Sequence, residues 1–263
     1  MTFDNISAIF SAFDPQLNVL SSERLYSGLS NDNFLVHTAQ QAYLLKSYRE
    51  HWPSIGLAAQ ASFAEYKVCP APMWLNEEKK LAIFEYIDGD IAQDNYTSEL
   101  IKKLVSLHQH NIVTEPMDIK FELDYYSDTE LYQQYQQGVE SALVYIYSQP
   151  RDNGFCHNDL VKENIILNTE GMYLIDFEYA KTNDVYFDLA ALAVSFELTQ
   201  IQKAQLLKTY HSYLPQQCNF SPSIEKLKCY QVVFLVLCIC WYSARGVSDK
   251  VKKLCEQLDY LIQ

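Results

Sequence analysis

The alternation of apolar and polar residues near the start of the chain predicts antiparallel strands. Between residues 19 and 47 it gives three runs, LNVLSSERLY, NFLVHT and QAYLLKS, with a turn signal at Ser27-Gly28. A helix follows, for which Ser54 is the predicted N-cap and which runs to about Lys67, where the CPAP segment ends it. Two more short apolar runs, MWL and LAIFEYI, complete a predicted set of five strands and one helix.

Beyond Asp88-Gly89 the apolar residues recur every three or four positions, which predicts helices. SELIKKLVSLHQH and TELYQQYQQGVESALVYIYSQ carry this pattern. Two very short apolar runs, NIIL and MYLID, are joined by NTEG and read as a β-hairpin. We therefore predict an α+β protein of two lobes: a small antiparallel-sheet lobe over residues 1–87 and a larger, mainly helical lobe over residues 88–263.

Charge narrows the class of partner. The formal net charge of −13 argues against a nucleic-acid partner, because such proteins need basic patches to displace counterions from phosphates. An acidic surface favours a cationic small molecule, although an acidic globular protein without such a partner has the same composition. Hydrophobic residues make up 49% of the 263 positions, which is enough for a substantial core.

Cysteine usage and apolar segments bear on location. Seven cysteines, an odd number without any CxxC pair, predict neither a disulfide framework nor a zinc site and favour a reducing cytoplasm. The acidic start of the chain does not resemble a signal peptide. The apolar run from Val232 to Trp241 is about half of the roughly 20 residues that a membrane span needs. We predict a buried core helix there and no membrane insertion.

The segment from Phe155 to Ala180 carries the most informative polar residues. It places Asp159, Asn164 and Asp176 around the predicted hairpin, whose two ends lie close together. Phosphoryl transfer needs a carboxylate that orients the attacking hydroxyl and hard oxygen ligands for Mg²⁺. These three side chains supply that minimum, and a polar loop beside a structural hairpin is the alternative.

The motif His157-x-Asp159-x4-Asn164, followed by Asp176 in IDFE, resembles the signature of the aminoglycoside phosphotransferase and choline kinase superfamily. The resemblance implies a protein-kinase-like fold and an enzyme that uses ATP and Mg²⁺. It implies that Asp159 orients or deprotonates the acceptor hydroxyl, that Asn164 and Asp176 hold the metal, and that His157 braces the catalytic loop. Asp188 matches the family's aspartate that accepts hydrogen bonds from this loop, with an ordinary acid at a helix start as the alternative.

The segment from Tyr26 to Phe34 is similar to the family's nucleotide loop. In such a loop Gly28, Ser30 and Asn31 would let backbone N–H groups approach the phosphates. An ordinary hairpin turn has the same residue types, and the loop has one glycine where the family usually has more.

Lys46, at the end of YLLK, matches the family's phosphate-binding lysine. The family usually pairs this lysine with a glutamate of the following helix, and both Gln60 and Glu65 lie near that place, so its partner stays open. The segment EYIDG, from Glu85 to Gly89, resembles the family's hinge between the lobes. There the backbone of Glu85 and Ile87 would contact the edge of the adenine ring.

Three further residues are predicted to have structural roles and no part in catalysis or metal binding. His108 and His110 have no acidic or cysteine partners at metal-binding spacing, and we expect them to be exposed helix-cap residues. Cys156 is expected to be a packed strand-end residue and not a nucleophile.

The resemblance does not name the acceptor. The segment DFEYAKTNDVYFDLAAL is closer to choline and thiamine kinases than to aminoglycoside enzymes, which implies a small cationic alcohol such as choline, ethanolamine or thiamine. An aminoglycoside or another small molecule is the alternative. A cation beside a primary alcohol suits aromatic faces and carboxylates. The candidates for these contacts are Glu178, Tyr179, Glu197, Trp241 and Tyr242. In choline kinases a late helix supplies two tryptophans; Trp241 matches the second, and Cys238 stands at the first.

Two rival functions share features with this sequence. A kinase-fold binding module without catalysis would explain the missing helix glutamate, but the intact Asp159, Asn164 and Asp176 argue against it. A protein kinase is disfavoured because the chain has no HRD motif, GxGxxG loop or APE-like segment.

Overall fold

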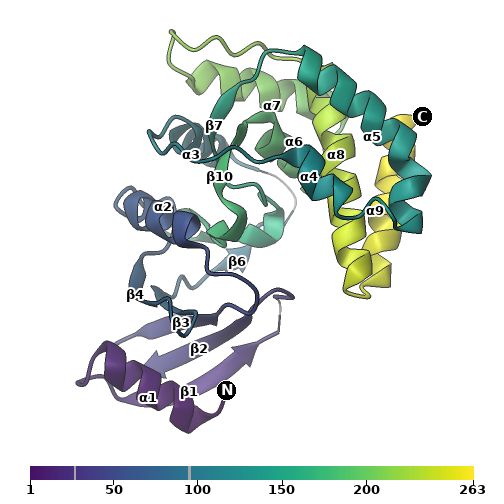
Figure 1. The fold of residues 1–263 in the computed structure, drawn as a ribbon. Helices are drawn as coiled ribbons and strands as arrows, with labels where there is room; N and C mark the ends of the chain where they lie inside the picture. The colour runs from purple at the N-terminus through teal and green to yellow at the C-terminus, as the bar shows by residue number, and fades with distance from the viewer. Residues whose placement is uncertain (27, 94–95) are drawn as a thin grey trace. The chain divides into compact units, whose positions relative to one another are not determined.

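The computed structural model describes residues 1–26, 28–93 and 96–263 (Figure 1). The chain forms two compact units. The first consists of Met1–Asp90 and Ile166–Glu178, and the second of Ile91–Ile165 and Tyr179–Gln263. These units differ from the predicted lobes, because the hairpin segment Ile166–Glu178 belongs with the N-terminal residues. The boundary between the predicted lobes stays a prediction. Ser27, part of the predicted turn, lies outside the described residues.

The first unit is built on the predicted five-stranded antiparallel sheet, of order β1-β2-β3-β5-β4 (Figure 1). Each predicted apolar run forms one strand, because alternate side chains of a strand face the core. The strands are β1 (Val19–Leu25), β2 (Asp32–Thr38), β3 (Ala42–Ser47), β4 (Pro72–Asn76) and β5 (Leu81–Glu85).

A helix that the sequence analysis did not predict, α1 (Phe3–Phe13), precedes the sheet. Thr2 caps it by accepting a hydrogen bond from the backbone N–H of Asn5. Ile6 and Phe10 are one turn apart on its buried face and join the core of the sheet, where Phe10 meets Tyr43 edge to face at 5.5 Å between ring centroids. α1 therefore covers one face of the sheet.

The second helix of this unit is α2 (Ser54–Ala64). Its N-cap residue and its last residue both differ from the prediction. Its N-cap is Pro53, which offers no side-chain cap, so the predicted capping role of Ser54 is wrong. It ends before Lys67, whose φ of 53° is left-handed and stops helical geometry. Gly56 lies against the backbone of Phe177: a Cβ at this glycine would stand 1.9 Å from the Phe177 carbonyl oxygen.

The predicted hairpin is present as β8 (Ile165–Asn168) and β9 (Gly171–Leu174), with β6 (Asp90–Ile91) beside β8. The Asn168 side chain closes the turn by accepting hydrogen bonds from the N–H groups of Glu170, at 2.9 Å, and Gly171, at 3.1 Å. The hairpin ends are thereby fixed in register, and the chemistry-bearing residues follow directly from them.

The second unit is mainly helical, as predicted, with a two-stranded sheet that was not predicted (Figure 1). Its helices are α3 (Ser98–His108), α4 (Ile119–Asp124), α5 (Glu130–Ser148), α6 (Tyr186–Ser195), α7 (Gln200–Tyr213), α8 (Ile224–Ala244) and α9 (Ser248–Ile262). Its sheet pairs β7 (Asn153–Cys156) with β10 (Lys181–Asp184), and short 3₁₀ turns cover Lys162–Asn164 and Phe177–Tyr179.

The apolar run predicted as a core helix lies within α8, which is 21 residues long. By length and composition α8 could cross a membrane, so the argument from its shortness was wrong. In its most apolar window 61% of the residues are buried inside the protein, as in the core helix of a globular domain. α8 packs against α5, α6 and α9 in this unit.

Candidate active site

The loop that carries Asp159 follows β7 and is held by a buried carboxylate. Asp188, in the first turn of α6, accepts a hydrogen bond from the backbone N–H of His157 through one oxygen and of Asn158 through the other, each at 2.8 Å. Such charge-assisted bonds are about twice as strong as neutral ones. The contact expected for Asp188 from the sequence is present in the structure.

Asn158 takes a left-handed backbone conformation, with φ of 63°, and its side chain is fully used to hold it there. Its Nδ2 donates to the carbonyl oxygens of Tyr179, at 3.0 Å, and Lys181, at 3.2 Å. Its Oδ1 accepts from the amide of Asn183 at 2.9 Å. These contacts offset a conformation that costs about 1–3 kcal/mol and fix the turn immediately before Asp159.

The side chain of Asp159 is oriented by Asn164. The Nδ2 group of Asn164 donates to the backbone oxygen of Asp159 and to its Oδ2, both at 2.9 Å. Both amide hydrogens are thus engaged, and the amide oxygen is the atom that can still bind a ligand. The N–H of Asp159 donates to Nδ1 of the buried His157 at 3.3 Å, so His157 braces the loop from within.

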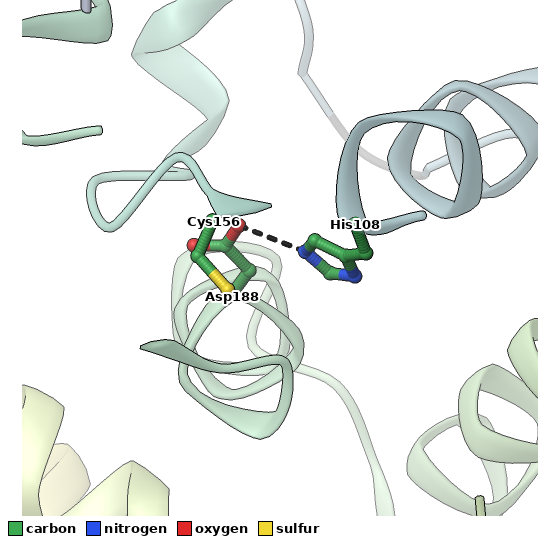
Figure 2. A group of neighbouring side chains, drawn as sticks. All are labelled: His108, Cys156 and Asp188. Carbon is green, nitrogen blue, oxygen red and sulfur yellow. Dashed lines mark hydrogen bonds and ion pairs between the residues drawn. The ribbon is translucent and has the colours of Figure 1, made fainter. Parts of the chain in front are cut away.

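His108 supports the loop from α3, and the prediction that it is exposed was wrong. Figure 2 shows its ring beside Asp188, with Nε2 at 3.1 Å from the carboxylate. Its Nδ1 lies 2.7 Å from the hydroxyl of Tyr210. His108 is buried because it continues the apolar face of Leu100 and Leu104 at four-residue spacing. That spacing was the signal that could have identified it.

Cys156 lies beside His108 and Asp188 in Figure 2, and their potential ligand atoms all fall within 4.8 Å of one another. Metal binding at such a site requires a thiolate. Burial, together with the charges of Asp188 and Asp184, raises the pKa of the Cys156 thiol well above its usual value. The cluster therefore supports the loop, and the prediction of a packed strand-end cysteine is confirmed.

In the first unit, Lys46 of β3 is buried and pairs with the carboxylates that follow β9. Its Nζ lies 2.5 Å from Oδ1 of Asp176 and 3.9 Å from Oε2 of Glu178. Asp176 has a left-handed φ of 65°, the second such residue in the predicted signature. The partner of Lys46 is therefore Asp176, supported by Glu178.

Neither residue that the sequence offered as the partner of Lys46 fills that role. The Gln60 side chain is uncharged and donates to the carbonyl oxygen of Pro70 at 3.0 Å. Glu65 is exposed at the C-cap of α2. A carboxylate brought in by the hairpin segment substitutes for the helix glutamate, and sequence position could not show this because 130 residues separate Lys46 from Asp176.

Glu178 was predicted to contact the acceptor, and that contact stays a prediction; the structure shows the partners of Glu178 within the chain. Its carboxylate is buried and accepts a hydrogen bond from the amide of Asn31 at 2.5 Å, within the same unit. Burial and the charge of Asp176 raise the pKa of Glu178, while Lys46 and the Asn31 amide act in the opposite direction. Glu178 thus joins the predicted nucleotide loop to the lysine.

Lys46, Asp176 and Gln60 line a cavity of about 120 Å³ in the first unit. Its other walls are mostly apolar and include Tyr48, Gly56, Leu57, Phe84 and Phe177. The predicted nucleotide contacts Gly28, Ser30, Glu85 and Ile87 are not part of this lining. Their contacts to a nucleotide stay predictions.

The remaining predicted acceptor contacts lie in the second unit. Tyr179 is partly exposed, and its carbonyl oxygen holds Asn158. Glu197 is exposed, has a left-handed φ of 50°, and pairs with Lys253 of α9 at 2.5 Å. Glu197 is thus already matched by a cation of the chain.

The aromatic pair at the end of α8 also has cationic neighbours. The guanidinium of Arg245 lies 3.7 Å from the ring centroid of Trp241, and Nζ of Lys250 lies 5.6 Å from that of Tyr242. Burial and the negative charge of Asp159 raise the pKa of the Tyr242 hydroxyl, to which the thiol of Cys238 also contributes. The negative charge of Asp159 therefore acts at the Tyr242 hydroxyl.

The structure distributes the predicted site residues over both units. The first unit holds Gly28, Ser30, Asn31, Lys46, Glu85, Ile87, Asp176 and Glu178, and the second holds His157, Asp159, Asn164, Tyr179, Asp188, Glu197, Trp241 and Tyr242. The contacts described above connect Asn31, Lys46, Asp176 and Glu178 in the first unit. In the second unit they connect His157, Asp159, Asn164 and Asp188.

Comparison with known proteins identifies the family. The sequence profile of the phosphotransferase enzyme family matches residues 22–220. Protein LicA of Haemophilus influenzae is 33% identical over 88 residues, and the match spans only 33% of either chain. The fold matches the crystal structure of choline kinase LicA from Streptococcus pneumoniae with a TM-score of 0.81, 21% identity and 98% of both chains covered.

A LicA structure solved in complex with AMP gives a TM-score of 0.77 at 22% identity, again covering 98% of both chains. At these identities the structures establish a common fold. The family profile covers more than half of the chain and includes the Asp159 loop, the hairpin and Asp188. The chain therefore belongs to the phosphotransferase enzyme family.

Proposed function

We propose that this enzyme transfers the γ-phosphoryl group of ATP to the hydroxyl of a small cationic alcohol, with choline first and ethanolamine or thiamine next. The observation that carries phosphoryl transfer is the double hydrogen bond from Asn164 that orients the Asp159 carboxylate. The names of the LicA choline kinases support a choline-like acceptor. So does an aromatic ring, Tyr242, within electrostatic reach of Asp159.

Asp159 performs the proton step in this proposal. The acceptor hydroxyl donates a hydrogen bond to the Asp159 carboxylate, which takes the proton as the oxygen bonds to the γ-phosphorus of ATP and the bond to the β-phosphate oxygen breaks, releasing ADP. The loop held by Asp188 and Asn158 keeps the carboxylate in place, so little reorganisation is needed.

Asn164 and Asp176 suit Mg²⁺ by their donor chemistry. Mg²⁺ takes carboxylate and amide oxygens, and Asn164 has its amide oxygen left after both hydrogens are used. The Asp176 side chain is one-third exposed, so an ion can reach it. We assign both as its ligands; when bound, Mg²⁺ would neutralise charge on the phosphates.

Lys46 is the proposed phosphate contact, oriented by Asp176 and Glu178, with Asn31 holding Glu178. This gives residues 1–87 the nucleotide role and residues 88–263 the catalytic and acceptor role. Because ATP is the proposed donor and none of the seven cysteines, all within the described residues, forms a disulfide, we also propose a cytoplasmic location.

The test is release of ADP by the wild-type chain with choline, ethanolamine, thiamine, kanamycin and 3,3-dimethylbutanol, the neutral isostere of choline. Asp159→Asn is the matched variant, because it keeps the shape of the side chain. We expect the cationic alcohols to be preferred, and turnover to fall at least about a hundredfold in the variant with ATP affinity kept.

Wild-type turnover in Asp159→Asn would overturn the assignment of the base. A preference for kanamycin or the neutral isostere would overturn the cationic acceptor and leave phosphoryl transfer standing. Absence of ADP release with every acceptor would overturn the proposed function as a whole.

A further inference from the structure

The ring of Tyr242, on which the charge of Asp159 acts, already carries a cation of the chain itself. Lys250, in the first turn of α9, places Nζ over the ring of Tyr242 at 5.6 Å from the centroid, within the range of a cation–π contact. Tyr242 packs edge to face against Trp241, whose ring is covered by Arg245. The two rings are therefore contacted by different cations, Trp241 by Arg245 and Tyr242 by Lys250.

Lys250 also contacts the segment next to the catalytic loop. Its Nζ makes an ion pair of 2.8 Å with Oε1 of Glu163, the residue before Asn164. Asn164 in turn holds the Asp159 carboxylate. A continuous set of contacts therefore links the Lys250 ammonium to the catalytic carboxylate within one unit.

The surroundings of the ring are strongly favourable for a positive charge. The carboxylates of Asp159 and Glu163 both raise the pKa of the Tyr242 hydroxyl, which shows that their negative charge acts there. Glu163 also lies close by, with its Oε1 at 2.8 Å from the Lys250 ammonium. Lys250 thus satisfies the same features that an acceptor ammonium would need: a ring face and two carboxylates.

We propose that Lys250 is a built-in competitor for the acceptor cation, so that an ammonium group binding on Tyr242 has to displace the lysine from the ring. This rests on the proposed function, since it needs a cationic acceptor. The lysine side chain is about a third exposed and can move toward solvent while its flexible stem keeps it near Glu163. Lys250 therefore sets the affinity for cationic acceptors and has no effect on neutral ones.

The test is Lys250→Met, which keeps the length of the side chain and removes its charge. Lys252→Met, an exposed lysine on the same helix, is the matched control. We expect the Kd for tetramethylammonium, measured by calorimetry, and the KM for choline to fall about fivefold in Lys250→Met. This change is equivalent to the ~1 kcal/mol of a cation–π contact at a partly exposed site. The KM for ATP and for 3,3-dimethylbutanol should stay within twofold, and the control should match wild type.

A second variant protects the test against a folding defect. Lys250→Gln should give the same gain, and in a Tyr242→Leu background Lys250→Met should give none, because no ring is left to compete for. Unchanged or weaker binding of tetramethylammonium in both Lys250 variants would overturn the proposal and make the lysine a structural tie. If the wild type neither binds tetramethylammonium nor uses choline, the proposed acceptor class fails first, and the wild-type arm alone shows it.

Discussion

Glu178 shows how one buried carboxylate can serve a site without touching the reacting atoms. It lies between Asn31 and Lys46 and is placed there by the turn after β9. Because Asp176 stands beside it, the two carboxylates share one lysine. The two carboxylates carry more negative charge than Lys46 neutralises until a cation or metal is bound. The free energy of unfolding should therefore depend on pH.

The variant Glu178→Gln tests how the ionisation of this one carboxyl group contributes to the pH dependence of stability. The pKa of Glu178 is raised by burial and by Asp176, so the folded chain binds the proton more tightly than the unfolded chain. The stabilisation from this group is fully present below its unfolded pKa and is lost as pH rises through the folded pKa. Glutamine does not ionise and avoids that loss. The free energy of unfolding of Glu178→Gln minus that of wild type should therefore increase from about pH 4 to about pH 7.

Urea unfolding at a series of pH values measures this difference. Glu65→Gln, at an exposed position of the same unit, controls for the removal of one carboxylate. A difference between Glu178→Gln and wild type that is constant or shrinks with rising pH would contradict the prediction.

Residues whose role depends on their neighbours along the chain were predictable. Asp159, Asn164 and Asp188 lie within one segment, and its resemblance to the phosphotransferase signature indicated a loop held by an aspartate of the following helix. The contact between Glu178 and Asn31 could not be predicted, because 147 residues separate them and no periodicity links two positions at that distance. His108 was misread for want of a metal partner, although its helical spacing placed it in the core.

At the scale of elements, two glycines in helices have opposite surroundings. A Cβ at Gly138 in α5 would meet no atom within 4 Å, whereas one at Gly56 in α2 would overlap the carbonyl oxygen of Phe177. The usual preference of helices for alanine over glycine, about 1 kcal/mol, applies only where the side chain has room.

Gly138→Ala should therefore raise the free energy of unfolding by about 0.5–1 kcal/mol, and Gly56→Ala should lower it by about 1–3 kcal/mol through overpacking. Gly56→Ala should also weaken ATP binding, because Phe177 follows Asp176 directly. Chemical denaturation and ATP titration of both variants measure the two effects. Equal stability of the two variants would show that α2 can move away from Phe177 without loss.

Elements were predicted where period and length agreed. The five strands of the first sheet and the helices α3 and α5 follow the apolar pattern closely. α1 was not predicted, although Ile6 and Phe10 lie one turn apart on its buried face. The pair β7–β10 was missed because each strand has four residues, and Asn183 and Asp184 are polar yet buried by hydrogen bonds and an ion pair. Such strands carry no alternating signal.

At the scale of the whole molecule, the excess of acidic residues acts on every approaching charge. A net charge of −13 attracts cations over roughly the Debye length, about 10 Å at 0.1 M salt and about 3 Å at 1 M. We expect the KM for choline to rise several-fold between about 0.02 and about 0.5 M NaCl, because capture depends on this attraction.

Steady-state kinetics over that salt series provides the measurement, with 3,3-dimethylbutanol as the uncharged control. The KM of the control should stay nearly constant. A choline KM that is independent of salt would mean that the local contacts at Tyr242 act alone and that the overall charge contributes nothing to capture.

The division of the chain into interleaved units also dictates an order of events during synthesis on the ribosome. Residues 1–90 emerge first, but Ile166–Glu178, which completes their unit, follows only after the whole of Ile91–Ile165 has been translated. Until then Asp176 is not available to pair with Lys46, and Phe177 is not available to cover Gly56 of α2. Nascent chains stalled before Glu178 would therefore be substrates for chaperones and proteases, and the first unit cannot be transplanted as a continuous N-terminal fragment.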